Sequence, residues 1–380
     1  MTEICFGLAL LFLFLAVHPY TTYPLSLTFM RKRPLQPPAP GWRRPSVAIC
    51  MSAFNEERVI IAKVEGLLAM AENYGPAKIY IYVDGAQDRT AERLEPYRDR
   101  INLVVSTEQR GKTIGLKTLV AQAEGELLAF TDANVLVPPD SLIKLVEAVQ
   151  DPDVCAASAR LLYSNASETG ISASGAVYWN IEEFIKSLET ETVGMIGVDG
   201  ALFVIERSAY FPPPDELIDD LYVSMSALLT GKRVVSAQSV MVEERSAARW
   251  NEEFHRKARI ACQAINVHRA LWSRIRKAPA DIVYCYLSHR FLKWLTPFSL
   301  LFGGLFLLAG LWLRFGLAAP LIVAGLLLAL LAGAWLNLPG CRMVVAAVIA
   351  LTGVAYGQIE ALLGRRTYTT WVPAATVRDE

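Results

Sequence analysis

The sequence predicts an α/β protein in which a mostly parallel, doubly wound sheet is flanked by transmembrane helices at the N- and C-terminal ends. From residue 46 onward, short apolar runs alternate with amphipathic segments, which is the pattern of βα units. Apolar stretches near both ends approach the roughly 20 residues that cross a bilayer. The chain has 380 residues, of which 53% are hydrophobic, too many for a wholly soluble protein.

The first apolar stretch, residues 4–17, predicts a retained membrane helix within residues 1–30. A signal peptide is the alternative, but Glu3 stands where a basic region should be and no A-x-A cleavage site follows. Residues 31–45 contain five basic residues and five prolines and are interpreted as a stiff linker. Basic residues beside a span favour the cytoplasmic side, so we expect a cytoplasmic domain at the plasma (inner) membrane.

Residues 46–275 form the expected globular domain. Its first half predicts strands at 47–51, 78–83, 102–105 and 127–131 and helices at 55–70 and 113–123. Its second half is less regular, with an expected helix at 171–189, a strand at 201–205 and a charged helix at 251–273. The first strand is followed by no G-x-G-x-x-G, and the chain has no G-x-x-x-x-G-K-[ST], so a dinucleotide dehydrogenase and a P-loop NTPase are disfavoured.

Residues 276–296 mix aromatic and basic side chains, which predicts a helix lying in the membrane interface. The alternative is an ordinary amphipathic helix packed on the domain. Three apolar runs then predict C-terminal membrane helices within 297–364, before a tail at 365–380. These runs are 297–313, 317–336 and 343–362.

The number of true crossings stays open. If all three runs cross, Arg365 and Arg366 lie outside the cell, against the positive-inside tendency. The last run also carries Gln358 and Glu360, so either it is re-entrant or interfacial, or the charge rule fails here.

Composition excludes several other classes of protein. Lys plus Arg and Asp plus Glu balance at 37 each, so nucleic acid is not an expected partner. The six cysteines are scattered, which indicates buried thiols in a reducing compartment. The four histidines form no HxxxH or HExxH pattern, so imidazole metal chemistry is not expected.

Polar residues follow the apolar run 127–131 directly. Asp132 and Asn134 would stand at the carboxyl end of a buried strand, the edge where open α/β sheets bind ligands. Their oxygens suit Mg²⁺ or Mn²⁺ beside a diphosphate. The alternative is a helix-capping aspartate in an ordinary βα loop.

Further polar residues stand at other strand ends or in the loops that follow them: Asn55 and Glu56, Asp84 in an Asp-Gly pair, Lys112 after Arg110-Gly111, and Asp220 after Asp219. Each has an ordinary alternative, such as a turn, a solvated lysine or an acid pair that starts a helix.

In their order and spacing, these motifs resemble the family 2 glycosyltransferases, and more specifically their membrane-embedded branch of cellulose, chitin and hyaluronan synthases and bacterial exopolysaccharide transferases. The resemblance covers residues 46–260 and implies a nucleotide-sugar-binding, GT-A-like domain. It implies a donor site formed by Asn55, Glu56, Asp84, Lys112, Asp132 and Arg259, metal ligands Asp132 and Asn134, and Asp220 as general base.

The sequence departs from the family pattern at two motifs. The family's DxD reads Asp132-Ala133-Asn134, so an amide replaces the second carboxylate. The family's QxxRW keeps only its arginine, Arg259, and ends in Ile260. The missing tryptophan argues against long-chain processive synthesis.

The resemblance implies a membrane-bound inverting glycosyltransferase in cell-surface or extracellular polysaccharide synthesis. It would move a sugar from a nucleotide diphosphate sugar to a lipid-linked or growing saccharide acceptor. Membrane lipids are further expected partners, and an export or regulatory protein is another candidate. Two alternatives stay open: a polyprenyl-phosphate sugar transferase, and a catalytically weak nucleotide-sugar-binding regulator of a partner synthase.

Overall fold

The computed structural model describes residues 1–165, 170–245 and 249–370. Its centre is a seven-stranded sheet in the order β3-β2-β1-β4-β6-β5-β7. The strands are β1 (Val47–Ala53), β2 (Ala77–Asp84), β3 (Asn102–Ser106), β4 (Leu127–Thr131), β5 (Val154–Tyr163), β6 (Leu202–Glu206) and β7 (Arg233–Glu244). β6 runs antiparallel to both neighbours, and the other paired strands are parallel. The predicted α/β class and mostly parallel sheet are therefore confirmed.

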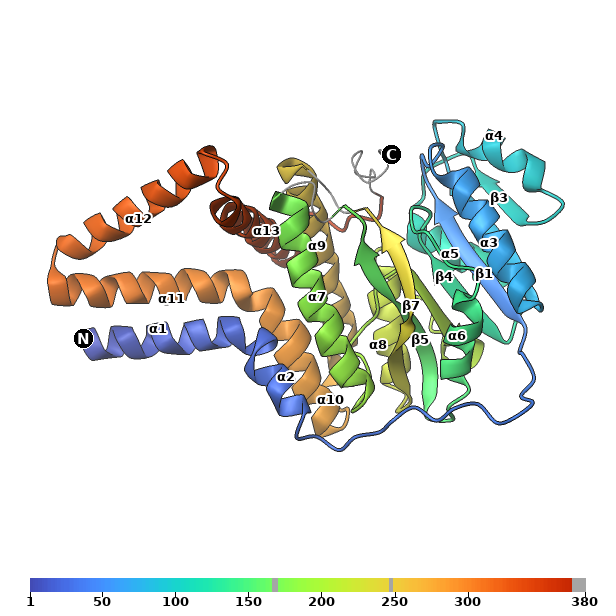
Figure 1. Ribbon diagram of the computed structural model, residues 1–380, viewed down its shortest axis with the longest axis horizontal. Coiled ribbons are helices and arrows are strands. Elements are labelled where there is room, and N and C mark those ends of the chain that lie inside the picture. Colours follow the sequence, from blue (N-terminus) through green and yellow to red (C-terminus); the bar gives the residue numbers. More distant parts are fainter. Residues whose placement is uncertain (166–169, 246–248, 371–380) are drawn as a thin grey trace.

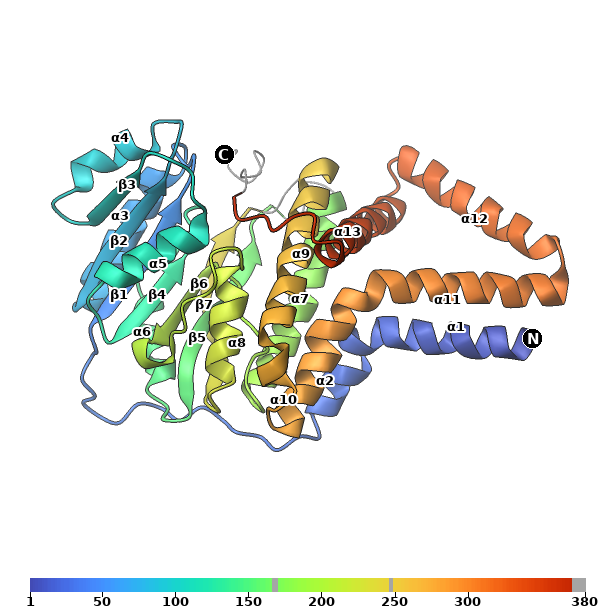
Figure 2. The same ribbon diagram turned by 180° about the vertical axis from the view of Figure 1, so that it is seen from behind.

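Helices cover both faces of the sheet. α3 (Ile60–Tyr74) and α6 (Ser141–Val149) pack on one face, and α5 (Lys112–Gln122) and α8 (Asp219–Leu228) pack on the other (Figures 1 and 2). The short α4 (Thr90–Leu94) lies beside α3. Because both faces are covered, the central strands are nearly continuous runs of buried residues.

The first helix begins later than the sequence predicts. We expected it over 55–70, but α3 begins at Ile60. Asn55 has a positive φ of 53°, so the chain turns two residues after the end of β1. The residues between β1 and α3 therefore form a loop at the carboxyl edge of the sheet, where β2 and β4 also end.

Two long helices lie between the sheet and the membrane helices: α7 (Gly170–Thr190) and α9 (Trp250–Ile275) (Figure 1). Beyond them α1 (Thr2–Val17) and α11 (Leu292–Phe315) run side by side away from the domain, and α12 (Ala318–Trp335) returns. The pairing of α1 with α11 is close, because a Cβ on Gly303 would lie 3.0 Å from Leu13 Cγ. The short α2 (Thr22–Leu27) connects α1 to the linker.

The expected boundary at residue 296 is not a break in the chain. α10 (Ala280–Cys285) continues through a π-type turn (Tyr286–Phe291) into α11, so Ala280–Phe315 is one helical segment with Pro297 inside it. Tyr286 and His289 in this segment are buried against the domain. The structure therefore shows that this segment packs on the domain. Its contact with the membrane interface stays a prediction.

In the part of the chain that the structure describes, four helices are long and apolar enough to cross a membrane: Thr2–Tyr20, Ala280–Phe315, Ala318–Trp335 and Pro339–Leu362, the last being α13. α13 is oriented differently from the others, since Figures 1 and 2 show it nearly end-on where α1 and α11 lie lengthwise. It packs against α9 through two glycines four residues apart. A Cβ on Gly353 would lie 2.8 Å from Phe254 O, and one on Gly357 would lie 2.0 Å from Ala258 O. Small residues at this spacing let helix backbones approach closely.

The chain after α13 returns to the domain. Gln263 Nε2 in α9 donates to Tyr368 O at 3.1 Å, and Cys262 Sγ lies 3.3 Å from Arg366 O. A Cβ on Gly111 would meet Thr369 O at 2.4 Å. The described end of the chain therefore lies on the same side of the membrane helices as the sheet.

Gly357→Leu is expected to separate α13 from α9, because even one Cβ lacks room there. Cys262, which is fully buried under the returning chain, should then become reactive. Alkylation of Cys262 measured by peptide mass spectrometry checks this. Gly340→Leu is the matched control, since its Cβ would meet nothing within 4 Å. Protection of Cys262 in Gly357→Leu equal to that in the control would contradict the close packing.

Candidate active site

Asp84, at the end of β2, fixes the loop that precedes Lys112. Its carboxylate accepts hydrogen bonds from the backbone N–H of Arg110 at 2.8 Å and of Gly111 at 2.9 Å. Gly85 is required beside it, because its φ is +63° and a Cβ would lie 2.4 Å from Gln109 N. Asp84 is buried, so a direct contact with the nucleotide stays a prediction.

Lys112 is the first residue of α5 and lies between two carboxylates. Its Nζ is 2.8 Å from Asp132 Oδ1 and 3.4 Å from Asp219 Oδ1. Burial alone would lower the pKa of Lys112, but the negative charges of Asp132, Asp219 and Asp220 outweigh burial and raise it. The ammonium group therefore keeps its positive charge at the amino end of a helix, where anions are favoured.

Asp219 and Asp220 open α8 and have different surroundings. Among the described residues, the ion pairs of Lys112 are with Asp132 and Asp219. Burial, followed by the adjacent charge of Asp219, raises the pKa of Asp220 to about 7. One oxygen of Asp220 accepts from the N–H of Leu221. Asp219 therefore balances the positive charge of Lys112, whereas Asp220 has a pKa close to neutral pH.

Glu244 is a further acid, and it approaches the Asp132 loop from β7. Asn134 Nδ2 donates to Glu244 Oε1 at 2.9 Å, and burial, with a contribution from Asp132, raises the pKa of Glu244 to about 7. The sequence analysis did not single out Glu244. The only signal was its place at the end of an apolar alternation in a region judged irregular.

The remaining candidate residues border this cluster. Asn55 Oδ1 accepts from Gln87 N at 2.8 Å, and Glu56 N donates to Thr90 Oγ1 at 2.8 Å, so both join the β1 loop to the β2 loop. Arg259 comes from α9: burial and then Arg256 lower its pKa, while Asp220, Asp132 and Asp219 oppose them. The structure thus gathers Lys112, Asp132, Asp219, Asp220 and Arg259, with Asp84 one loop away.

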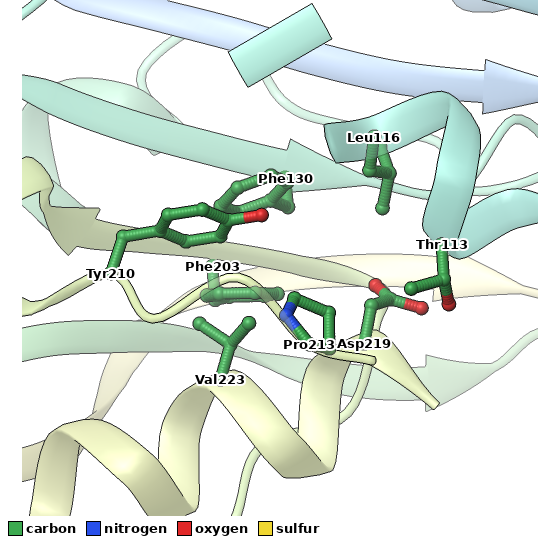
Figure 3. A pocket seen from close by; sticks show the side chains of 8 residues that line it. All are labelled: Thr113, Leu116, Phe130, Phe203, Tyr210, Pro213, Asp219 and Val223. Atoms are coloured by element: carbon green, nitrogen blue, oxygen red, sulfur yellow. The ribbon is translucent and has the colours of Figure 1, made fainter. Parts of the chain in front are cut away.

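A narrow crevice lies behind Asp219 (Figure 3). Asp219 from α8 and Thr113 from α5 lie side by side at one end of it, and the aromatic rings of Phe130, Phe203 and Tyr210 form its apolar wall. It is too narrow to hold a water molecule. The crevice therefore has no room for a ligand beside Asp219.

Comparison with known proteins identifies the family of the chain. Residues 45–263, more than half of the chain, match the family model described as Glycosyltransferase like family 2. The chain belongs to this family.

Two curated relatives are similar to this family 2 chain over shorter stretches. An N-acetylglucosaminyltransferase of Rhizobium leguminosarum bv. viciae is 28% identical over 183 residues, which are 47% of this chain and 43% of the relative. A beta-monoglucosyldiacylglycerol synthase of Trichormus variabilis is 30% identical over 152 residues, 38% of this chain and 32% of the relative. The match spans less than half the length of each of these two relatives.

The fold of this family 2 chain is also that of a solved structure. The mannosyltransferase PcManGT from Pyrobaculum calidifontis, solved in complex with GDP-Man and Mn²⁺, superposes with a TM-score of 0.75. The alignment covers 95% of this chain and all of that one at 19% sequence identity. This likeness confirms the expected GT-A-like fold.

The family 2 chain contains a buried lysine that supports its Asp132 loop. Lys63, on α3 and 2% exposed, donates to Thr131 Oγ1 at 2.8 Å and to Val135 O at 2.7 Å. These two acceptors lie at the two ends of the Asp132–Asn134 loop. The sequence analysis missed Lys63, because a lysine in an amphipathic helix is ordinarily solvated.

Lys63→Met is expected to loosen this loop and to weaken nucleotide-sugar binding without preventing folding. Burial lowers the pKa of Lys63 to about 7 from its ordinary 10.5. Between these pH values the unfolded chain binds more protons than the folded one, so the stability contribution of Lys63 rises with pH. The melting temperature of the wild type relative to Lys63→Met should therefore increase from pH 7 to pH 10. A difference independent of pH would contradict the buried position.

Proposed function

We propose that this protein is a membrane-bound inverting glycosyltransferase that transfers a sugar from a nucleotide diphosphate sugar to a saccharide or lipid-linked acceptor. The observation that carries the proposal is the cluster of Lys112 with Asp132 and Asp219, beside Asp220, at the carboxyl edge of a family 2 sheet. A fixed cation there suits a diphosphate, and a nearby acid with raised pKa suits a general base.

Each residue then has a role in a one-step displacement. Lys112 and the amino end of α5 would bind the diphosphate and stabilise its negative charge as it leaves. Asp220 would take the proton from the acceptor hydroxyl as the oxygen attacks the anomeric carbon. A pKa of about 7 allows Asp220 to be ionised before the reaction and to accept a proton during it.

The oxygen ligands of the site fit Mg²⁺ or Mn²⁺. Within the described residues, no group of three or more His, Cys, Asp or Glu side chains has the arrangement of a closed metal site. Asp132, the amide oxygen of Asn134 and Glu244 nevertheless offer two carboxylates and one carbonyl, and Mg²⁺ is ordinarily held by one or two carboxylates together with substrate phosphates. When bound, such a cation supplies positive charge to the leaving diphosphate.

The same fold supports a definite membrane arrangement. Thr2–Tyr20, Ala280–Phe315 and Ala318–Trp335 would cross the membrane, and α13 would lie along its surface on the domain side. Residues 365–370 would then be cytoplasmic with the domain, which agrees with the positive-inside tendency of Arg365 and Arg366. A reporter fused after Thr370 should be accessible from the cytoplasm. Accessibility from the opposite side would contradict this arrangement.

Thermal unfolding with a panel of UDP-, GDP- and dTDP-linked sugars, each with Mn²⁺ or Mg²⁺, tests the proposal. A ligand that binds the folded protein at 100 times its Kd adds about 2.7 kcal/mol to the free energy of unfolding, so the true donor should raise the melting temperature. Transfer of radiolabel from that donor to membrane lipids would then separate an organic-soluble glycolipid product from polymer growth. Protection by none of these donors would contradict the proposal.

A further inference from the structure

The loop Ile196–Gly200, between α7 and β6, lies beside Lys112 and Asp132. A Cβ on Gly200 would lie 3.0 Å from Lys112 Nζ and 3.1 Å from Asp132 Oδ2. The loop backbone therefore packs directly on this ion pair, and any movement of the loop changes the space beside it.

The same loop also supports the helix turn that carries the proposed base. Val198 N donates to Ser224 Oγ at 3.1 Å, and Ser224 Oγ donates to Asp220 O at 2.6 Å. A Cβ on Gly197, whose φ is +90°, would lie 2.6 Å from Leu221 Cδ1. The loop thus contacts both the Lys112–Asp132 pair and the first turn of α8.

This loop is held from the other side by the helix that enters the membrane region. Arg290, in the segment Ala280–Phe315, donates through Nη2 to Gly197 O at 2.8 Å and through Nε to Ile196 O. A guanidinium is a planar fork, so two contacts of this kind fix the direction of the carbonyls. Removing it would leave buried carbonyl groups without these donors.

A second buried contact joins the loop to both membrane-entering segments. Glu189 Oε2, at the end of α7, accepts from Ile196 N at 3.1 Å. Its other oxygen accepts from Tyr23 OH at 2.6 Å, and His289 Nδ1 lies 2.7 Å from it. Tyr23 belongs to α2 and His289 precedes Arg290, so the position of the loop depends on how these segments pack together.

We propose that Arg290 is a positioning residue for sugar transfer. It holds the loop Ile196–Gly200 and thereby sets the distance between Asp220 and the Lys112–Asp132 pair according to the packing of the membrane-entering helices. The inference rests on the proposed function for its kinetic consequence. Its structural part, the control of the loop by Arg290, stands on the contacts alone.

The test compares Arg290→Met and the milder Arg290→Lys with Arg274→Met in the full-length protein in detergent. Arg274 also donates to α8, to Ser226 O at 3.1 Å, but at the end remote from Asp220. With the donor found by thermal protection, Arg290→Met should lower kcat about 100-fold, as a displacement of ~1 Å does, while KM for the donor changes little. Arg290→Lys should fall between, and Arg274→Met should match the wild type.

Hydrogen exchange of the loop amides gives a readout that needs no activity. Exchange at Ile196 and Val198 should accelerate in Arg290→Met and stay unchanged in Arg274→Met. Unchanged exchange, or equal losses of kcat and donor affinity, would overturn the inference. If Arg290→Met does not fold, Arg290→Lys decides by the same two measurements. Accelerated exchange in a protein that binds no nucleotide sugar would keep the loop control and reject the proposed function.

Discussion

Asp220→Asn is expected to abolish sugar transfer while nucleotide-sugar binding survives. The substitution keeps the size of the side chain and removes its ability to take a proton. Loss of a general base typically costs about 10²–10⁴-fold in rate. Product formation and thermal protection by the donor, measured on the same preparation, check the two halves of this statement. Normal turnover by Asp220→Asn would remove Asp220 from the mechanism.

The pH dependence of the wild type and the variant Asp219→Asn provide controls for the role of Asp220. Because burial and Asp219 raise the pKa of Asp220 to about 7, Asp220 is protonated and inactive below that pH. The wild-type kcat/KM should therefore rise with pH through a midpoint at about 7 and level off above it. In Asp219→Asn the neighbouring negative charge is gone, so the midpoint should move to lower pH. A midpoint unchanged in that variant would contradict the proposed coupling.

Lys112→Met should have the second-largest effect, and mainly on the donor. The ammonium group lies between Asp132 and Asp219, and without it these carboxylates repel each other and any incoming diphosphate. Losing one preorganised group that stabilises the leaving charge costs about 10²–10³-fold in kcat, and donor affinity should fall as well. Donor titration by thermal unfolding, together with initial rates, measures both effects.

Lys117→Met is the matched control for that substitution. Lys117 lies on the same helix and forms an ion pair with Asp215 at 2.6 Å, away from Asp132. Exposed pairs of this kind contribute little to stability, so the control should bind donor and turn over as the wild type does. Equal losses in the two variants would show that α5 has merely been destabilised.

The sequence predicts the part of the site that is formed by residues at the carboxyl ends of parallel strands. Asp84 and Asp132 terminate apolar runs, and parallel strands place their carboxyl ends at one edge, so their proximity follows from topology. The place of Asp220 came from the order of the family motifs. What brings it close to Lys112 is the contact between the start of α5 and the chain at the start of α8, where Thr113 Oγ1 donates to Leu217 O at 2.8 Å, and no local pattern predicts this contact.

The residues that the sequence analysis missed depend on contacts between distant segments. Glu244 reaches Asn134 because the segment after β4 pairs with the end of β7, where Leu136 N donates to Glu243 O at 2.9 Å. Lys63 looks like an ordinary helix lysine until α3 is packed beneath the Asp132 loop. The sequence left the placement of α13 open, because its length and apolarity suit a crossing helix while Gln358 and Glu360 suit an interfacial one. Its contact with α9 through Gly353 and Gly357 supports the interfacial placement proposed above.

An experimental structure with a nucleoside diphosphate and Mn²⁺ tests the central claim most directly. The account predicts the diphosphate against Lys112 and the amino end of α5, with the Mn²⁺ anomalous signal at ligand distance from the Asp132 carboxylate. The Asp220 carboxylate should lie on the side of the sugar opposite the diphosphate, where the acceptor hydroxyl attacks. A nucleotide bound elsewhere, with Lys112 still enclosed by Asp132 and Asp219, would contradict the account.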